Sequence, residues 1–321
     1  MIFEVSRPTN LPPLNHDEKY ISDLALSEIK QKIKSSGGKI TFSEFMHHAL
    51  YAPLLGYYSG KSKNFGESGD FITAAEETGI LGRIIAKQCS VILNEIPDAA
   101  IIEYGPGSGA LAVSILKQLL QMGLKPRAYY MVDVSEDLIE RQKNRISTEL
   151  PEIYDSVIWK SEIPDGFSGI VIGNEVIDSM PFERFMISNK RILQFFVGTK
   201  EEELVYKLEP ANIEIQKYVK RIESQIGKSL CEGYISEISF IGRDWINQIS
   251  LKLNQGMIIL LDYGVSRSEY YSDDKNQGWT HCHFKHHKHF EPLIYPGMQD
   301  ITTWVDFSLI SETAKANDMI V

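Results

Sequence analysis

Three glycines alternate directly after an apolar run that ends in a carboxylate, between Ile101 and Gly109. Apolar residues at helical spacing follow, so the pattern predicts a β-strand, a tight turn and an α-helix. Glycines in such a turn let the backbone pass close beneath a nucleotide, where a Cβ atom would collide with the ligand. The stretch therefore predicts a site for an adenine-containing cofactor, held by Gly105, Gly107 and Gly109.

Two cofactors fit this turn. Gly105, Gly107 and Ala110 match the dinucleotide pattern, whereas Glu103 followed by the three glycines matches the S-adenosylmethionine site of class I methyltransferases. Glu103 favours the second, because a carboxylate beside the turn would repel a pyrophosphate but suits a sulfonium and an ammonium group. We therefore predict that Glu103 contacts S-adenosylmethionine. A nicotinamide dinucleotide and a turn without any ligand stay open as alternatives.

The next strand also ends in a carboxylate, Asp133, which can accept hydrogen bonds from two ribose hydroxyls. Ser135 follows as the predicted N-cap of a helix, and we count it with the cofactor-binding residues. Trp159 ends a third strand, where its ring could stack on adenine or pack in the core. These three residues extend the predicted nucleoside site beyond the glycine turn.

A further candidate segment precedes the first strand. Thr73 and Glu76 form a capping box, and the helix that they begin leads directly into the strand before the glycine turn. Asp70, Phe71 and Thr73 are therefore predicted to lie close to the cofactor. Asp70 could instead be an ordinary turn residue beside Gly69.

The fourth strand, Gly169 to Gly173, ends in an amide and two carboxylates: Asn174, Glu175 and Asp178. Ligands of an open parallel sheet collect at the carboxyl ends of its strands, so these groups are predicted to be catalytic. Methyl transfer is an in-line displacement that needs a positioned acceptor lone pair. Paired carboxylates can hold a planar guanidinium by bidentate hydrogen bonds. The alternative is a polar strand end that caps a helix.

Five histidines and a cysteine lie between His281 and His289. Their spacing does not match a structural zinc site and no second cluster accompanies them, so we expect no metal. We interpret the segment as a basic, flexible loop over the active site, with His283 and His286 facing the substrate. Such a loop would gain positive charge near pH 6.5.

Strand-like runs and amphipathic helices alternate along the chain, which predicts an α/β fold with a doubly wound sheet. A helix is expected from Ile21 to Lys34, and a capping box at Thr41 begins another. We predict an N-terminal helical and loop extension at 1–75, a cofactor-binding domain at 76–184 and 251–321, and an inserted lobe at 185–250 for substrate or dimerisation.

The composition excludes several classes of protein. The 321 residues are 43% hydrophobic, which suffices for a core, yet no apolar run reaches membrane-spanning length. A formal net charge of −10 argues against general nucleic-acid binding. Three scattered cysteines and the absence of a targeting pattern predict a reducing, cytoplasmic location.

These motifs together resemble the MidA-like family of methyltransferases, which is related to a mitochondrial complex I assembly factor that methylates arginine. The most specific pieces, in this order, are Gly69-Asp70-Phe71, Asn174-Glu175 and Cys282-His283. The resemblance covers most of the chain from about residue 20. It implies a class I methyltransferase fold, S-adenosylmethionine as the donor, a protein arginine as the acceptor and a role in respiratory complex assembly.

Two departures from the family pattern stand out. Asp133 occupies a position where the family often has glutamate, which keeps the carboxylate. The chain also stops at Val321, at the expected start of a sixth strand, whereas proteins of this type continue into a further strand pair. We therefore expect an exposed sheet edge, which favours a homodimer.

Two other functions stay open from the sequence. One is a nicotinamide-dependent oxidoreductase, and the other is a non-catalytic assembly chaperone on a methyltransferase fold. The intact glycine turn argues against the second.

Overall fold

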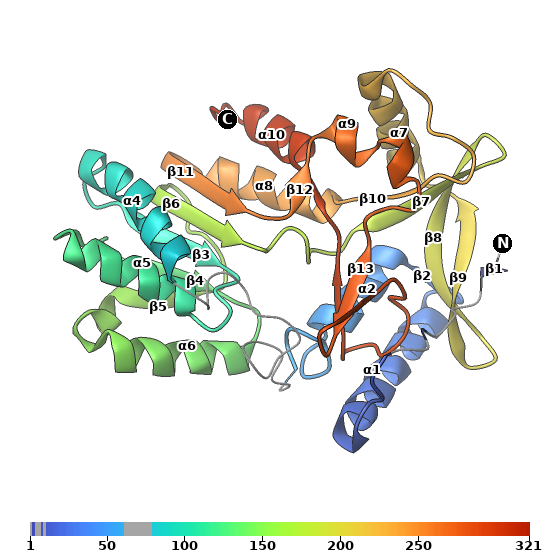
Figure 1. Cartoon of the computed structure of the whole chain (residues 1–321), viewed down its shortest axis with the longest axis horizontal. Helices are drawn as coiled ribbons and strands as arrows, with labels where there is room; N and C mark the ends of the chain where they lie inside the picture. Colours follow the sequence, from blue (N-terminus) through green and yellow to red (C-terminus); the bar gives the residue numbers. More distant parts are fainter. Residues whose placement is uncertain (1, 4–7, 9–10, 61–78) are drawn as a thin grey trace. The chain divides into compact units, whose positions relative to one another are not determined.

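The computed structural model describes residues 2–3, 8, 11–60 and 79–321. The chain divides into two compact units. The parallel-sheet unit comprises Lys61–Val176 and Asn247–Asp262, and the antiparallel-sheet unit comprises Met1–Gly60, Ile177–Ile246 and Tyr263–Val321. Figure 1 shows the chain coloured along its sequence. Asp70, Phe71 and Thr73 of the predicted site lie outside the described residues.

The parallel-sheet unit contains a five-stranded sheet in the order β11-β6-β3-β4-β5, in which every neighbouring pair is parallel. The predicted α/β fold with a parallel sheet is therefore confirmed. The strands are β3 (Ala100–Tyr104), β4 (Tyr129–Val132), β5 (Val157–Lys160), β6 (Phe167–Asn174) and β11 (Leu253–Leu261). Strand β11 forms one edge, and its apolar residues 257–261 are only half-buried.

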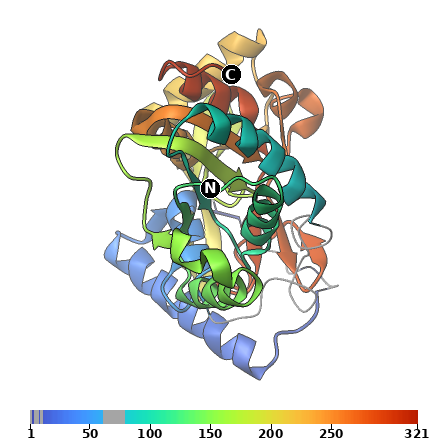
Figure 2. The ribbon, with the colours of Figure 1, turned by 90° about the vertical axis from the view of Figure 1, so that its left-hand side faces the viewer.

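Three helices of this unit bury apolar faces against the sheet: α4 (Ile80–Glu95), α5 (Ala110–Gln121) and α6 (Glu136–Glu149). Figure 2 turns these helices toward the viewer. Helix α5 buries Leu111, Ile115 and Leu119, a 3.6-residue spacing that explains why this segment is helical. A short 3₁₀ helix, Pro151–Ser156, connects α6 to β5. This packing fixes the loops at the strand ends.

The antiparallel-sheet unit is built around a six-stranded sheet in which each pair is antiparallel. Its strands are β1 (Ile2–Phe3), β2 (Lys39–Thr41), β7 (Glu183–Ser188), β8 (Arg191–Lys200), β9 (Glu203–Pro210) and β10 (Ile235–Ile238). Its longer helices are α1 (His16–Ser35), α2 (Phe42–Tyr51) and α7 (Ile213–Ile226). Helix α8 (Phe240–Lys252) leads along the chain from this unit into β11.

The last third of the antiparallel-sheet unit consists of short elements. They are β12 (Gly264–Val265), α9 (Arg267–Tyr270), the 3₁₀ helix Asp273–Lys275, β13 (His281–Phe284), β14 (His287–His289), β15 (Asp300–Thr302), β16 (Val305–Asp306) and α10 (Phe307–Lys315). The predicted domain boundaries differ from this grouping, because residues 263–321 were expected in the cofactor-binding domain. They pair instead among themselves, as β12 with β16 and β13 with β15.

Three local predictions need correction. The segment from His281 to His289 is a β-hairpin of β13 and β14 rather than a flexible loop, because alternate side chains are buried and the turn residues Lys285 and His286 adopt positive φ. The first helix begins at His16, since Asn15 and Glu18 form a capping box. Residues 318–321 follow α10 without forming a strand.

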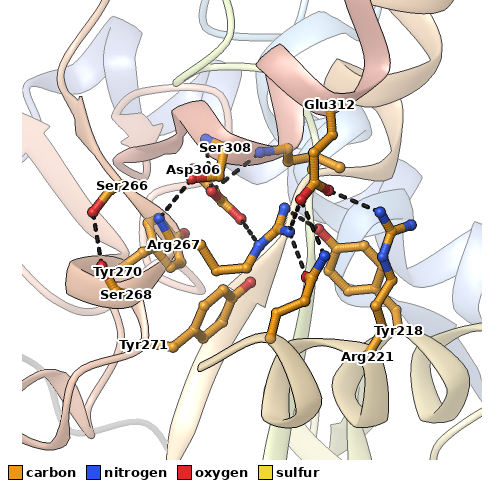
Figure 3. A network of polar contacts seen from close by, with 12 residues as sticks. Tyr218, Arg221, Ser266, Arg267, Ser268, Tyr270, Tyr271, Asp306, Ser308 and Glu312 are labelled. Atoms are coloured by element: carbon orange, nitrogen blue, oxygen red, sulfur yellow. Dashed lines mark hydrogen bonds and ion pairs between the residues drawn. The ribbon is translucent and has the colours of Figure 1, made fainter. Parts of the chain in front are cut away.

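A buried arginine, Arg267, connects the last helix of the chain to the other helices of the antiparallel-sheet unit. Arg267 Nε lies 2.9 Å from Asp306 Oδ2, and its Nη1 lies 2.7 Å from Glu312 Oε1 (Figure 3). Nη1 also donates to Gln225 Oε1 on α7 at 2.6 Å. Three helices, α7, α9 and α10, therefore share one guanidinium. Because the arginine and Asp306 are both buried, each depends on the other for its charge.

We expect Arg267→Met to lower the free energy of unfolding by about 3–5 kcal/mol, since it leaves the buried Asp306 carboxylate without its ion pair. Urea denaturation monitored by circular dichroism measures this loss. Arg221→Met is the matched control, because Arg221 contacts the same Glu312 from an exposed position. Equal denaturation midpoints for the two variants would contradict the central role of Arg267.

Candidate functional site

The carboxyl ends of β3, β4, β5 and β6 carry most of the residues predicted to bind or react. Parallel pairing brings these ends to one edge of the sheet. The glycine turn follows β3, Asp133 follows β4, Trp159 lies in β5 and Asn174 ends β6. Residues that are up to about seventy positions apart in sequence are thus gathered within one unit.

The glycine turn has the backbone geometry that its sequence predicts. Gly105, Gly107 and Gly109 have φ values of +60°, +52° and +80°, a region that side chains other than glycine rarely adopt. A Cβ atom on Gly105 would lie 3.1 Å from Val176 Cγ2, so the turn after β6 packs against the glycine turn. No atom of the described residues lies within 4 Å of a Cβ built on Gly107. A ligand can therefore approach the backbone there.

Gln142 on α6 connects three of the predicted cofactor-binding elements, and the sequence analysis missed it. Its side chain is completely buried, at 0% exposure. Nε2 donates to the Gly107 carbonyl at 2.8 Å and to Asp133 Oδ2 at 2.7 Å. Oε1 accepts from Trp159 Nε1 at 2.9 Å. One feature of the sequence could have identified Gln142. It lies four positions from both Leu138 and Ile146, which places this polar residue on the buried face of α6.

Asp133 is held from two sides. Oδ1 accepts from the Ser135 N–H at 3.0 Å, while Oδ2 accepts from Gln142. Burial raises the pKa of Asp133, and these hydrogen bonds oppose the rise. Ser135 Oγ accepts from the Leu138 N–H, which confirms that Ser135 is the N-cap of α6. Contacts of Asp133 and Ser135 with a nucleoside stay predictions.

Glu103 lies in the core of the sheet with 2% exposure. The Tyr129 hydroxyl donates to its Oε2 at 2.6 Å. Burial raises the pKa of Glu103 to about 7, although the hydrogen bond from Tyr129 opposes this. The raised pKa favours the neutral carboxyl group and so reduces the attraction that Glu103 offers to a sulfonium or an ammonium group. Its contact with the cofactor stays a prediction.

Trp159 is half-buried at the end of β5, where its ring is fixed by several contacts. Besides the hydrogen bond to Gln142, Lys143 Nζ lies 5.4 Å from the ring centroid and the Tyr154 ring lies 6.2 Å away. Stacking of Trp159 on adenine stays a prediction.

Glu175 has the most unusual backbone of the predicted catalytic residues. Its φ of +51° is left-handed, and its N–H donates to the Leu261 carbonyl at 2.8 Å. Its carboxylate accepts no hydrogen bond from any residue that the structure describes, and burial raises its pKa. Strained residues of this kind are concentrated at functional sites.

The other two predicted catalytic residues flank Glu175. Asn174 is half-buried at the end of β6, where it pairs with Leu261 of β11. Asp178 belongs to the antiparallel-sheet unit, and its carbonyl accepts from the Thr303 N–H at 3.0 Å. The structure therefore brings Asn174 and Glu175 to the sheet edge and places Asp178 in the unit that follows.

The histidine hairpin has different electrostatics from those expected. His283 faces Asp300 across the ladder, and its ring lies 5.1 Å from that of His281. Burial and then the neighbouring His281 lower the pKa of His283 to about 4. Burial also lowers the pKa of His281 and His289. The expected gain of charge near pH 6.5 is thus wrong for these three residues. His286 is exposed in the turn.

The described residues contain neither a metal-binding cluster nor a membrane-spanning helix. No group of three His, Cys, Asp or Glu residues there is placed to hold a metal ion. Within the same ranges, each helix is too short or too polar to span a bilayer.

Several known proteins are similar to this chain. A family described as "Putative S-adenosyl-L-methionine-dependent methyltransferase" matches residues 81–321. The chain is 29% identical to the "Protein arginine methyltransferase NDUFAF7 homolog, mitochondrial" of Caenorhabditis elegans, with 94% of this chain and 72% of the relative covered. It is 26% identical to human "Protein arginine methyltransferase NDUFAF7, mitochondrial", with coverages of 90% and 68%.

Two solved structures from Burkholderia thailandensis are also similar. One is a protein bound to S-adenosyl-homocysteine, with a TM-score of 0.90, 31% identity, and coverage of 96% of this chain and 80% of that chain. The other is a native crystal structure, with a TM-score of 0.86, 30% identity, and coverages of 96% and 79%. The fold of the whole described chain therefore has experimental counterparts.

The Glu103–Tyr129 pair predicts a pH dependence of stability. A carboxyl group whose pKa rises from 4.5 to about 7 on folding stabilises the fold below pH 4.5 and loses that contribution as the pH rises through 7. Glu103→Gln removes the titration. The melting temperature of this variant relative to wild type should therefore increase between pH 5 and 8.

Tyr129→Phe provides the matched control, because it removes the hydrogen bond that lowers the pKa of Glu103. Its own pH-dependent loss of stability should begin near the same pH as in wild type but extend to a higher pH, because the folded-state pKa of Glu103 rises further. A difference between Glu103→Gln and wild type that does not vary with pH would show that Glu103 titrates normally.

Proposed function

Because the chain belongs to this family of S-adenosyl-L-methionine-dependent methyltransferases, we propose that it methylates arginine side chains of a protein substrate. S-adenosylmethionine, when bound, supplies the electrophilic methyl group on a sulfonium. The proposal extends to a cytoplasmic location and to a role in assembling a respiratory complex. The two relatives named above carry "protein arginine methyltransferase" in their names, which supports the choice of acceptor.

The residues of the parallel-sheet unit fit the donor. The space beside Gly107 admits a ligand at the backbone, and Asp133 offers a fixed carboxylate to a ribose. The buried network around Gln142 keeps both in place. We propose that these residues, with Glu103 and Ser135 beneath and beside them, hold the nucleoside.

The observation that carries the choice of acceptor is the environment of Glu175. Its backbone is left-handed at a strand end, and its half-buried carboxylate accepts no hydrogen bond from any described residue, so the carboxylate is available to an acceptor. Its neighbour Val176 packs near Gly105, which sets Glu175 beside the glycine turn. A carboxylate there can hold a guanidinium by two parallel hydrogen bonds.

Glu175 would act on the acceptor in two ways. Its negative charge concentrates the positive charge of the guanidinium on the bound nitrogens, which leaves more electron density on the nitrogen that is methylated. It can then accept the proton that this nitrogen releases. Burial raises the pKa of Glu175, which makes it a better base than an exposed glutamate. We propose that Asn174, at the end of the same strand, assists in orienting the acceptor, and Asp178 stays a further catalytic candidate.

We expect Gly107→Ala to weaken binding of S-adenosylhomocysteine by about 10-fold or more in isothermal titration, because a methyl group would occupy the ligand's approach. Gly123→Ala is the matched control. Gly123 also has positive φ and no described atom near a built Cβ, so both variants strain the backbone alike. Equal affinities in the two variants would place the ligand elsewhere. Titration with NAD distinguishes the oxidoreductase alternative.

We expect Glu175→Gln to retain affinity for S-adenosylhomocysteine but to lose at least about 100-fold in methyl transfer, since the amide can neither pair with a guanidinium nor take its proton. The assay uses radiolabelled S-adenosylmethionine with a cell extract as acceptor, followed by amino-acid analysis for methylarginine. Glu152→Gln, an exposed change in the same unit, is the control.

If the radiolabelled methyl group is found in an amino acid other than arginine, arginine is not the acceptor, although methyl transfer itself still occurs. Full activity of Glu175→Gln would remove this residue from the catalytic role. Binding of the nucleoside without any labelled product would favour the non-catalytic alternative.

A further inference from the structure

We propose that Gln142 is a positioning residue that locks the glycine turn and Asp133 into one arrangement, and thereby gives the site its preference for a ribose with both hydroxyls. The inference rests on the proposed nucleoside-binding role of these two elements. It assigns a role to a residue of α6 that the comparisons do not mention.

The hydrogen-bonding capacity of Gln142 permits one orientation only. An amide group has two N–H donors and one carbonyl acceptor. Both acceptors that face it, the Gly107 carbonyl and Asp133 Oδ2, meet Nε2, while the indole N–H of Trp159 meets Oε1. A flipped amide would set oxygen against two acceptors and NH₂ against a donor. Because the side chain is fully buried, water cannot compensate for such a mismatch.

The consequence for Asp133 is a fixed carboxylate plane. Oδ1 is anchored by the Ser135 N–H and Oδ2 by Gln142, so two different elements restrain the two oxygens. A carboxylate in a fixed plane can accept from two adjacent hydroxyls together, which a freely rotating carboxylate does less well. Without Gln142, one of these restraints disappears while the negative charge stays.

The consequence for the glycine turn is a fixed carbonyl at its centre. Gly107 has left-handed φ, and no described side chain lies over it. One helical turn after Gln142, Arg145 Nη1 donates to Ser108 Oγ at 2.8 Å. Helix α6 thus holds two adjacent turn residues, but only Gln142 also holds Asp133. This difference allows the two functions of the helix to be separated by mutation.

The test compares affinities for S-adenosylhomocysteine and its 2′-deoxy analogue by isothermal titration. We expect wild type to prefer the ribose form by about 10-fold or more, the effect of losing a hydrogen bond to a charged group. Gln142→Met should weaken binding of the ribose form by about 10- to 100-fold and bring the ratio of the two affinities toward one. Arg145→Met should weaken both ligands and keep the ratio.

Two further variants control for folding. Gln194→Met removes an equally buried, hydrogen-bonded glutamine of the antiparallel-sheet unit and should leave both affinities unchanged. Gln142→Asn keeps the amide group but shortens the side chain by one methylene, so it should no longer reach both Gly107 and Asp133. If Gln142→Met does not fold, as judged by circular dichroism, Gln142→Asn must show the same loss of ratio.

The outcomes separate the inference from the proposed site. An unchanged ratio in Gln142→Met or Gln142→Asn, together with a reduced ratio in Asp133→Asn, would overturn the inference and leave the site standing. Unchanged affinity and ratio in Asp133→Asn would overturn both, because the ribose would not contact Asp133. A reduced ratio in the Gln142 and Asp133 variants, with the ratio kept in Arg145→Met, supports the positioning role.

Discussion

Parallel pairing of five strands is the constraint from which the rest of the candidate site follows. In a parallel sheet all strands point the same way, so each following loop emerges at the same edge. The pairing of Tyr104 with Val132 and Gly173 brings the glycine turn, Asp133 and Glu175 to that edge. The chain returns through α5 between β3 and β4 and through α6 between β4 and β5. Helix α6 then supplies the polar side chains that hold the glycine turn and Asp133.

Much of the parallel-sheet unit could be predicted because its signals are local. A short apolar run, a glycine turn and a capped amphipathic helix each depend on neighbouring residues. The strands near 101, 129, 157, 169 and 256 and the N-cap at Ser135 were therefore found from the sequence. The family resemblance was also correct, since the methyltransferase family matches residues 81–321.

The features that the sequence did not predict depend on contacts between residues that are far apart in the chain. Gln142 looked like an ordinary polar helix residue, since its three partners come from three other segments of the chain. The histidine segment was misjudged because composition indicates charge but not pairing. Strand β13 is stabilised by β14 and by β15, and burial in that sheet lowers the pKa of His281 and His283. Residues 263–321 group with the antiparallel-sheet unit. This grouping likewise depends on strand pairings that no local sequence pattern reveals.

The left-handed backbone of Glu175 also bears on how the protein can evolve. A glycine there would relieve roughly 1–2 kcal/mol of conformational strain without disturbing the hydrogen bond to Leu261. A selection for heat resistance alone would therefore favour the loss of this carboxylate, whereas selection for its chemistry opposes that loss. Under the role proposed for Glu175, stability and activity therefore make opposite demands on this one position.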